Sequence, residues 1–404
     1  LLYCGPHNMK DRIMRRSNVT QRILLVAVGA CLFCYATAQA KKPSQPGGGG
    51  DAPYALVDLE GLPVAGRDFF QSAALSVNEP AGAGSVQVVG ASYADAGDYH
   101  PALWNVNPDG SFATTNLGLP PLAREAFATD INDWGVITVN TTQSYDIQNG
   151  IPILPAWVSV PGLPLQLLPF DTHGADPMGI NNVMEIAGTH SNGTGAWWQL
   201  DAAGVPGDPI DLGAGWAAFI PSDISDSDPA GIADSGVAVG WNQHQPAIAY
   251  FVNGVLQVAP LDPSRGAATG MATAISPDGT WVVGWLGAPA GNGDEMAFRW
   301  SATTGITELG RLGGDASIAL GVNNEGDVVG WANTGDRRRP QTAFLHKDGQ
   351  LFDLDLLADT GGKIQLLEAT EINNAGHIVG KMNVTSGKSS EWHAFVLIPT
   401  SPEQ

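Results

Sequence analysis

The sequence predicts an all-β protein, a seven-bladed β-propeller of four-stranded antiparallel blades, and two kinds of repetition support this prediction. The first is a turn of the form Asn-x-x-Gly followed by a β-branched run that closes on glycine, most clearly at residues 322–330 and 372–380. Once a degenerate copy at 131–135 is counted, the closing glycines lie roughly 44 to 52 residues apart, a period typical of repeat arrays and propellers. They are Gly90, Gly188, Gly240, Gly284, Gly330 and Gly380.

The second repetition is that each unit contains four short strand-like runs. In the sixth unit these runs are residues 318–322, 327–331, 342–346 and 350–354, all bounded by Gly, Asn or Asp. Runs of this kind, rich in β-branched and aromatic residues and separated by tight turns, indicate antiparallel hairpins. Four such runs in a unit of about 47 residues match one propeller blade.

The two ends of the repeat region predict a closed ring. An aromatic residue marks the third strand of every unit, but only the first six units continue into a fourth run. An unmatched run with the same alternation, Ala55–Leu62, lies before the first unit. We therefore expect it to form the outer strand of the seventh blade, which ends near Leu397, and so to cover two sheet edges. The alternative, an open β-solenoid, needs capping units at both ends. The marker aromatics are Trp104, Trp157, Trp198, Phe251, Phe298, Phe344 and Phe395.

The tight turns carry a conformational prediction. Gly326 and Gly376 end two of the Asn-x-x-Gly turns. A four-residue loop between antiparallel strands commonly ends on a left-handed residue, which glycine adopts without steric cost. We therefore expect both glycines to have a positive φ angle.

The N-terminal segment has the features of an export signal. Basic residues between Met9 and Arg22 precede an apolar run of 13 residues, 23–35, and Ala38-Gln39-Ala40 is a cleavage motif of the A-x-A type. The apolar run is too short to span a membrane, so we expect a secretory signal peptide and no integral membrane span. The expected divisions are 1–40 as upstream residues and signal peptide, 41–53 as a flexible Gly/Pro linker, 54–399 as a single propeller, and 400–404 as a C-terminal tail.

Two alternatives to simple secretion stay open. Residues 28–31 weakly resemble a lipobox, which would leave the protein lipid-anchored at Cys31, and Arg15-Arg16 weakly resembles a twin-arginine signal. Cleavage after Ala40 would remove all three cysteines, so the exported chain would contain no disulfide and no thiol chemistry. We expect an extracellular or periplasmic location.

The composition agrees with an exported acidic all-β protein. The 404 residues include 51 Gly and 28 Pro, which disfavour long helices, and 44% of the residues are hydrophobic, enough for the cores between blades. Acids outnumber bases 40 to 19, for a formal net charge of −21. This excess argues against nucleic acid or an anionic membrane surface as a partner. We expect a monomer.

The C-terminal units resemble a known family. Ala297-Phe298-Arg299-Trp300, the run 309–317 with its Leu-Gly-x-Leu-Gly-Gly motif, and His393-Ala394-Phe395 are similar to the repeats of bacterial extracellular HAF-repeat proteins. The similarity is close over residues 274–398 and loose over 55–273, where Asn132, Asn181 and Asp234 keep only the turn. The resemblance implies export and a repeat fold, and it brings no assigned catalytic residues.

A search for catalytic motifs finds none. The sequence contains no H-E-x-x-H, no G-x-S-x-G and no Gly-rich phosphate loop that opens a helix. Residues 276–281 resemble a sialidase-type box that is one residue short, and we interpret them as the turn of the fifth repeat. The histidines occur mostly one per unit, without the close spacing of a metal site.

Calcium is the one candidate cofactor. Asp223, Asp226 and Asp228 form the densest group of carboxylates, and hard oxygen ligands of this kind suit Ca²⁺. The run fits no EF-hand or nonapeptide calcium motif, so a solvated acidic loop is the alternative interpretation.

The expected ligand site is the face of the propeller that carries its longer connections. First-to-second and third-to-fourth turns are tight and emerge together, whereas second-to-third loops and blade-to-blade crossings emerge on the opposite face, here called the long-loop face. Binding residues concentrate on such loops. The candidates on crossings are Arg67, Asp68, Arg124, Glu125, Asp171, His173, Asp223–Asp228, Arg265, Asp315, Lys363 and Glu368, and those on second-to-third loops are Tyr99, Trp241 and Arg337–Arg339.

Two functions follow from these features. The first is a non-catalytic binding or scaffolding propeller that recognises an extracellular glycan, peptide or protein through the long-loop face. The alternative is a secreted propeller hydrolase or lyase that uses carboxylates at the channel mouth, because a fold alone does not exclude activity. Two acids close together, one with a raised pKa, would favour the enzyme.

Overall fold

The computed structural model describes residues 52–400, except for 63–70, 81–83, 95–97, 122, 145–146, 149–150, 153, 171–173, 191–193, 214–218, 227–235, 263–268, 288–293, 359, 361–363 and 387–388. The described residues all belong to one compact unit.

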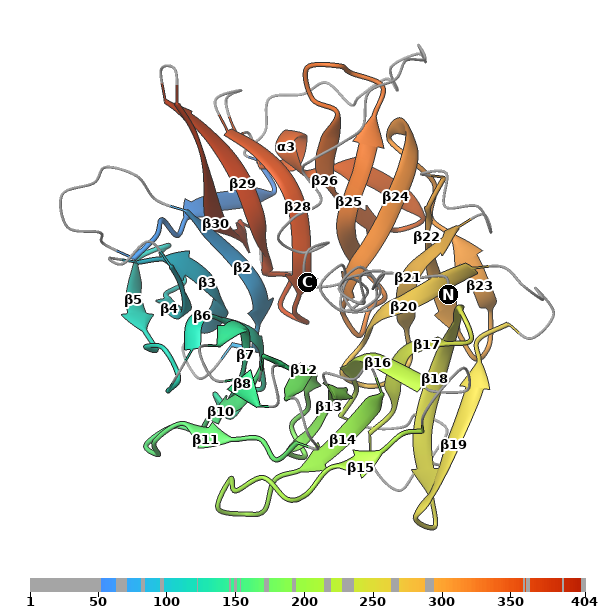
Figure 1. Cartoon of the computed structure of the whole chain (residues 1–404). Helices are drawn as coiled ribbons and strands as arrows, with labels where there is room; N and C mark the ends of the chain where they lie inside the picture. The colour runs from blue at the N-terminus through green and yellow to red at the C-terminus, as the bar shows by residue number, and fades with distance from the viewer. Residues whose placement is uncertain are drawn as a thin grey trace, which may run out of the picture. The chain divides into compact units, whose positions relative to one another are not determined.

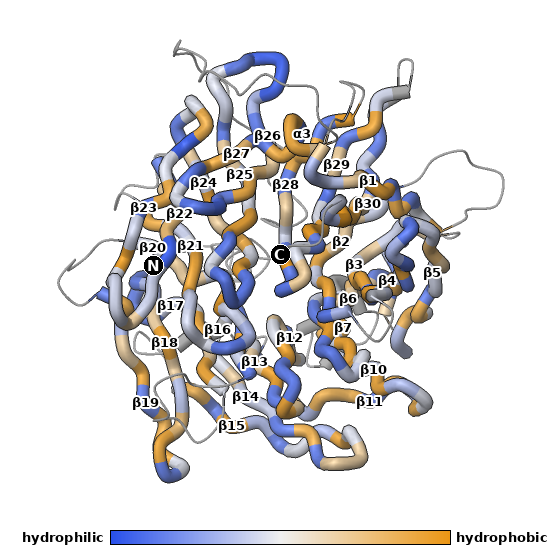
Figure 2. Tube along the Cα trace, turned by 180° about the vertical axis from the view of Figure 1, so that it is seen from behind, coloured by the Kyte–Doolittle hydropathy of each residue, from blue (hydrophilic) through white to orange (hydrophobic). Residues whose placement is uncertain are grey.

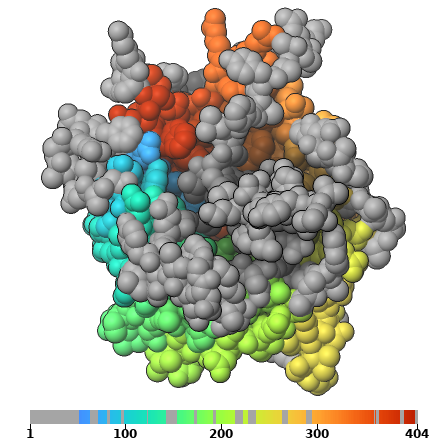
Figure 3. All heavy atoms as spheres, in the orientation of Figure 1, coloured from blue at the N-terminus to red at the C-terminus, as the bar shows by residue number. Residues whose placement is uncertain are grey.

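The described part of the chain forms seven four-stranded antiparallel sheets in a ring (Figure 1), which confirms the predicted seven-bladed propeller. Figure 3 shows the blades following one another in chain order around the ring. Blade 1 is β2 (Ser72–Val77), β3 (Val86–Tyr93), β4 (Tyr99–Val106) and β5 (Phe112–Asn116); blade 2 is β6 (Ala123–Ile131), β7 (Ile137–Ser144), β10 (Trp157–Ser159) and β11 (Gln166–Leu167). A small hairpin of β8 (Ile147–Gln148) and β9 (Ile151–Pro152) is inserted in blade 2.

Blades 3 to 6 repeat the same order. Blade 3 is β12 (Ala175–Ile180), β13 (Glu185–His190), β14 (Gly195–Gln199) and β15 (Ile210–Asp211); blade 4 is β16 (Phe219–Ile224), β17 (Ala238–Asn242), β18 (Gln245–Val252) and β19 (Val255–Pro260). Blade 5 is β20 (Thr269–Ile275), β21 (Val282–Gly287), β22 (Met296–Ser301) and β23 (Gly305–Glu308); blade 6 is β24 (Gly313–Val322), β25 (Val328–Thr334), β26 (Gln341–Lys347) and β27 (Gln350–Asp353), followed by the short helix α3 (Leu354–Leu357).

Blade 7 closes the ring with the N-terminal strand, as the sequence predicts. Its strands are β28 (Ile364–Ile372), β29 (Ile378–Ser386), β30 (Ser389–Pro399) and, outermost, β1 (Tyr54–Asp58). β1 pairs antiparallel with β30 from Tyr54 opposite Pro399 to Asp58 opposite Phe395. The seventh and first blades are also joined directly, because the Thr370 hydroxyl donates a hydrogen bond to the Ala74 carbonyl at 3.1 Å. The open solenoid is therefore excluded.

The hydrophobic core lies between neighbouring blades. Hydrophobic residues occur along the strands around the ring (Figure 2). Successive side chains point to opposite faces of a sheet, and strands such as β13 are buried along their whole length, so a sheet can pack against both neighbours. One cluster joins Trp104 of blade 1 to Val396 of blade 7, and another joins Phe395 of blade 7 to Leu345 of blade 6. Five of the seven marker aromatics are among the largest fully buried side chains: Trp104, Trp198, Phe298, Phe344 and Phe395.

Every innermost strand contains a β-bulge near its end. In β24 the pairing with β25 shifts between Ala319 and Gly321, and the same shift occurs in the other six innermost strands. In five blades the closing glycine of the second strand lies against a carbonyl of the bulged strand: a Cβ at Gly330, for example, would lie 2.0 Å from the Ile318 carbonyl oxygen. Blade 2 has Val139 at the corresponding position, opposite Ala128, which is why its copy of the motif is degenerate.

The tight turns have the predicted backbone. Gly326 and Gly376 both have a φ angle of +79°, which confirms the expectation. In blade 3 the equivalent position is Met184, which adopts a φ angle of +66° without being glycine.

Blade 4 departs from the sequence interpretation. The Asp234 motif was expected to form its first turn and residues 223–228 a crossing, but Asp223 lies in strand β16 and Ser225 begins the turn. The Ser225 N–H donates to the Val237 carbonyl at 2.9 Å, so the turn runs from 225 to 237. The prediction that Asp223 and Asp226 lie on a crossing between blades was therefore wrong. The first turn of blade 4 is longer than in the other blades, and the sequence of its second half resembles the repeat motif.

Gly326 and Gly349 provide a matched test of the turns. Both have positive φ angles, +79° and +74°, but a Cβ at Gly326 would lie 2.8 Å from the Trp281 ring, whereas nothing lies within 4 Å of a Cβ at Gly349. Gly349→Val should lower the free energy of unfolding by about 1–2 kcal/mol through backbone strain alone. Gly326→Val should cost at least about 1 kcal/mol more, because it adds overpacking. Urea denaturation measures both, and equal costs would contradict this account of the Gly326 turn.

Candidate functional site

A cavity of about 90 Å³ lies at the end of the channel where the tight turns meet. Its lining residues come from the ends of the innermost strands and from the turns that follow them, in six of the seven blades. The volume is enough for several water molecules or for one small charged group. The face that carries this cavity and the turns, here called the tight-turn face, is opposite to the long-loop face.

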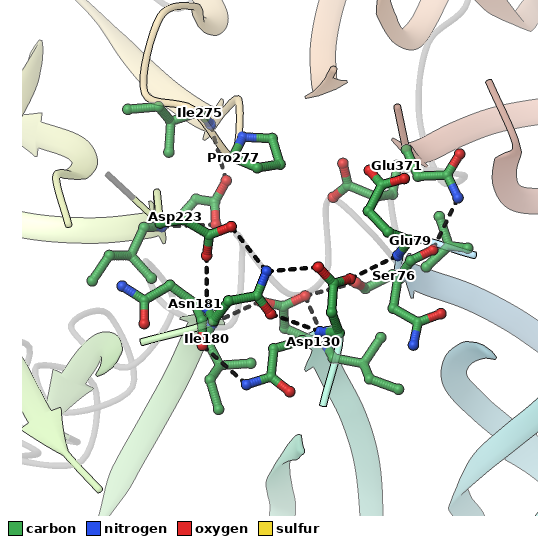
Figure 4. A pocket seen from close by; sticks show the side chains of 18 of the residues that line it. Ser76, Glu79, Asp130, Ile180, Asn181, Asp223, Ile275, Pro277 and Glu371 are labelled. Carbon is green, nitrogen blue, oxygen red and sulfur yellow. Dashed lines mark hydrogen bonds between the residues drawn. The ribbon is translucent and has the colours of Figure 1, made fainter. Parts of the chain in front are cut away.

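The cavity is strongly acidic. Six of its lining residues are acids, and none of the described residues that line it is basic. Three of the carboxyl groups, those of Asp130, Asp223 and Glu371, point towards a common space from strands β6, β16 and β28 (Figure 4). The other three, on the turns, are Glu79, Asp133 and Asp226.

The three channel acids occupy equivalent positions in their blades. Each directly follows the bulge of an innermost strand, a position held in the other blades by Ser76, Gly179, Ala274 and Gly321. The two glycines make room for neighbouring acids, since a Cβ at Gly179 would lie 2.7 Å from Asp223 Oδ1 and one at Gly321 would lie 3.1 Å from Glu371 Oε1.

Asp130 and Asp223 each join two blades. Asp130 accepts hydrogen bonds from its neighbour Ile131 N (2.8 Å), from Ile180 N of blade 3 (2.7 Å) and from the Ser76 hydroxyl of blade 1 (2.6 Å). Asp223 accepts from Ile224 N (2.7 Å) and from Ile275 N of blade 5 (2.9 Å). Glu371 differs, because its hydrogen bond is to the adjacent Ile372 N at 3.3 Å, within its own blade.

The turns form a closed ring of hydrogen bonds around the cavity. Each link joins the turns of two neighbouring blades. In six of the seven links, a backbone N–H at or next to the second residue of one turn donates to the side chain of the second residue of the next turn. In the remaining link the acceptor is the carbonyl of Pro277, in blade 5. The links are Glu79 to Asp133, Asp133 to Asn182, Asn182 to Asp226, Asp226 to Pro277, Asp278 to Asn324, Asn324 to Asn374, and Asn374 to Glu79.

Burial within the channel perturbs the carboxyl groups. It raises the pKa of Asp130 to about 6 and that of Asp223 to about 8, and the charge of Asp130 raises the Asp223 pKa further. Burial also raises the pKa of Glu371 well above its ordinary value, and the nearby Asp223 and Asp130 add to that shift. The cavity therefore retains protons at a pH where exposed carboxyl groups have lost them.

These carboxyl groups fit calcium poorly. Both oxygens of Asp223 and both oxygens of Asp226 already accept hydrogen bonds from the protein, and Asp228 lies outside the described residues. Within the described ranges, no group of three or more acid, histidine or cysteine side chains is arranged to hold a metal ion.

Most of the sequence candidates fall outside the described residues or have protein partners. Arg124 pairs with Asp98 at 3.1 Å, Asp315 accepts a hydrogen bond from Asn333 at 2.6 Å, and the buried Glu368 lies 3.9 Å from Lys381. Arg339 pairs with Asp353 and with Asp355. The candidates outside the described residues are Arg67, Asp68, Asp171, His173, Asp228, Arg265 and Lys363.

Three candidates do lie together on the long-loop face. Tyr99 and Arg124 lie at the junction of blades 1 and 2. Burial raises the pKa of Tyr99, and the charge of the nearby Glu125 adds to that shift.

The channel acids Asp130 and Glu371 were missed by the sequence analysis, although a signal for them exists in the sequence. Both lie two residues before the Asn that begins the turn, at Asn132 and Asn373.

The fifth-blade motif behaves as the turn that we inferred. Gly279 has a φ angle of +75°, and Ser276 N donates to the Trp281 carbonyl at 2.8 Å across the hairpin.

The described residues contain no helix that is both long enough and apolar enough to cross a membrane.

Comparison with known proteins assigns no family to the chain. No family model and no curated protein matches the chain. Among solved structures, a puromycin hydrolase mutant complexed with PGG is similar at 16% identity and a TM-score of 0.43, over 80% of this chain and 51% of that chain. An acylaminoacyl peptidase from Pyrococcus horikoshii is similar at 11% identity and a TM-score of 0.40, over 81% and 52%. The chain thus spans about half the length of either protein.

The shifted channel acids predict a pH-dependent stability. From about pH 4 to pH 8 the folded protein holds protons that the unfolded chain has lost, so these groups stabilise the fold at low pH and lose that contribution as the pH rises. Glu371→Gln should therefore raise the melting temperature at pH 8 by about 1–3 °C and have little effect at pH 4. Glu325→Gln, at an exposed turn acid on the same face, is the control. A Glu371→Gln shift that is equal at both pH values would contradict the prediction.

Proposed function

We propose that this chain is an exported, non-catalytic binding or scaffolding propeller that recognises an extracellular glycan, peptide or protein through its long-loop face. The observation that carries the proposal is the group of aromatic and charged side chains at the junction of blades 1 and 2. Tyr and Arg are enriched where proteins bind partners.

Contacts with the protein fix the positions of the aromatic side chains in this group. The rings of Tyr93 and Tyr99 meet edge to face with centroids 5.5 Å apart, and Tyr99 lies 5.8 Å from the buried Phe127. The Tyr99 hydroxyl donates to Gln71 Oε1 at 2.6 Å. Beside these rings, Arg124 keeps 49% of its side chain exposed while paired with Asp98. Rings fixed in this way lose little conformational entropy when a ligand binds.

The channel carboxylates also favour a binding protein over a hydrolase. A general acid or base must direct a free oxygen at the substrate. The oxygens of Asp130 and Asp223 instead accept peptide N–H groups from two blades each, which is a structural role.

One observation favours the alternative of a hydrolase or lyase. Asp130 and Asp223 come from different blades, line one cavity and have raised pKa values. Acids with perturbed pKa values in a cleft are candidates for catalysis. The activity screen described below distinguishes the two functions.

Export is part of the proposal and rests on the N-terminal signal and on the resemblance to HAF-repeat proteins. Mass spectrometry of the protein recovered outside the cytoplasm should find a mature chain that begins at Lys41, because cleavage follows Ala40. A lipid-modified N-terminus at Cys31 would show the anchored alternative instead, and an uncleaved chain would contradict export by this signal.

Replacing Arg67, Arg124 and Arg265 together by Ala should weaken binding about tenfold or more. The melting temperature should change little, because a surface ion pair such as Arg124–Asp98 contributes little to stability. Glycan and peptide arrays probed with the wild-type chain would supply the ligands, and calorimetry would measure each with the variant. Glu325→Ala, on the tight-turn face, is the control. Ligands that bind both chains equally would contradict a site on the long-loop face.

The purified chain should show no turnover of glycoside, ester or peptide substrates above background. Turnover that is abolished by replacing one carboxylate, such as Asp171, Asp223, Glu368 or Glu371, would establish the enzyme and overturn the proposal.

A further inference from the structure

The tight-turn face has one apolar sector. Four large hydrophobic side chains on the turns of blades 2 and 3 are exposed: Trp134 by 65%, Leu163 by 45%, Val183 by 48% and Val205 by 48%. Trp134 and Val183 occupy the third position of the first-to-second turns, and Leu163 and Val205 belong to the third-to-fourth turns. All four therefore emerge on the same face, and we call them the apolar patch.

Contacts between the turns hold the apolar patch together. The Trp134 ring N–H donates to the Asn182 carbonyl at 3.0 Å, which places the indole beside Val183. A Cβ at Gly135 would lie 3.4 Å from Pro161, in the turn that carries Leu163. A Cβ at Gly204 would lie 3.0 Å from Val160, so the Val205 turn contacts the same segment.

The corresponding turns of blades 5 to 7 are polar or small. Their third turn positions are Asp278, Glu325 and Ala375, and the third-to-fourth turns of blades 5 and 6 contain Thr303, Thr304, Lys347 and Asp348. Besides Val255 of blade 4, which is 59% exposed at the start of β19, the large exposed hydrophobic side chains on the described tight turns gather in blades 2 and 3. An exposed apolar cluster with a polar surround is typical of an interaction site.

The apolar patch adjoins the acidic cavity. Two residues that line the cavity are also neighbours of Trp134. Asp133 precedes it in the sequence, and the Asn182 carbonyl accepts the hydrogen bond from its indole N–H. The cavity holds six acids with no base among its described lining residues. Burying acids without a counter-charge costs free energy, and a cation that enters the cavity would offset that cost.

Glu371 is the channel acid with the weakest structural explanation. Asp130 and Asp223 bridge blades, but Glu371 bonds to the N–H of its own neighbour, and Gly321 of blade 6 leaves space for it. A carboxyl group held in the channel at a cost, without a bridging role, points to a ligand of opposite charge.

We propose that the tight-turn face of blades 2 and 3 docks an extended peptide segment of a partner protein, in which a Lys or Arg stands next to apolar residues. The apolar residues contact the patch formed by Trp134, Leu163, Val183 and Val205, and the basic side chain enters the cavity towards Glu371. This site is additional to the one proposed on the long-loop face.

The dimensions and the charge select this partner. A cavity of about 90 Å³ accepts an ammonium or guanidinium head group, whereas the apolar patch needs side chains on either side of that group. A peptide supplies both from one short segment, and Trp is the aromatic that best contacts a nearby cation. A bare metal ion would leave the apolar patch uncovered, and a neutral sugar would leave the acids without a counter-charge.

The test is a selection of phage-displayed random heptapeptides on the immobilised full chain, after depletion on the Trp134→Ser variant. Selected sequences should be enriched in Lys or Arg flanked by apolar residues. Calorimetry with the synthetic consensus peptide should show at least tenfold weaker binding to Trp134→Ser and to Glu371→Gln. Acetylating the peptide lysine, or replacing its arginine by citrulline, should weaken binding similarly.

Leu356→Ser is the matched control, because Leu356 is 51% exposed on helix α3, away from the tight turns, and its replacement should leave peptide affinity unchanged. Melting curves of every variant show that the fold is kept. Affinity should also rise from pH 5 to pH 8, because a bound cation favours the ionised carboxylates.

Four outcomes would overturn the inference: no peptide enriched over the depleted pool, a consensus without a base, binding that survives both Trp134→Ser and Glu371→Gln, or binding only of calcium chloride or a neutral oligosaccharide. The triple variant at Arg67, Arg124 and Arg265 separates this site from the long-loop face. Peptide binding lost in that variant but kept in Trp134→Ser would place the peptide on the long-loop face and reject the docking site proposed here.

Discussion

The β-bulge in each innermost strand is the constraint on which the rest of the propeller depends. One extra residue bends the strand where it reaches the channel and turns the next side chain inward. In five blades the bend brings a first-strand carbonyl so close to the second strand that a Cβ would not fit there, as at Gly330 and Gly380. The extra residue itself connects blades, because the hydroxyl groups of Thr273 and Thr370 donate to Ala319 and Ala74 of the following blades. The bulge is thus the common geometric origin of three features: the side chains that line the channel, the glycine of the repeat motif and the hydrogen bonds between neighbouring blades.

The sequence predicted the repeat and the ring closure because both depend on local chemistry. Turn residues, alternation and the unmatched Ala55–Leu62 run are visible without knowing any contact. The channel acids could not be found in the same way. A strict two-residue alternation places Glu371 on the same side as the buried Ala369, and only the bulge at Thr370 moves it into the channel. The turn of blade 4 was misplaced for a related reason, since an insertion after Asp226 separates the two halves of its motif.

Charge is distributed differently in the blades and in the channel. Several acids within the blades are paired with bases: Asp353 and Asp355 with Arg339, and Asp327 with Lys347 at 2.7 Å. In the channel, the partners of the acids are peptide N–H groups and not cations. A carboxylate has two acceptor oxygens and can accept hydrogen bonds from two blades, whereas a side-chain amide has only one acceptor oxygen. That role accounts for Asp130 and Asp223 despite their raised pKa values. It does not account for Glu371, whose buried carboxyl group is better explained by a ligand than by the fold.

The two faces of the propeller offer different kinds of binding surface. On the tight-turn face, the hydrogen-bonded ring from Glu79 to Asn374 fixes the positions of the turns before any ligand arrives. A ligand there has little protein entropy to overcome, so a small apolar patch and one charge can give useful affinity. On the long-loop face, the fixed rings of Tyr93 and Tyr99 give the same advantage at the junction of blades 1 and 2. One chain with both faces is suited to hold a peptide segment on one side and a larger surface on the other, which is the arrangement that a scaffold requires.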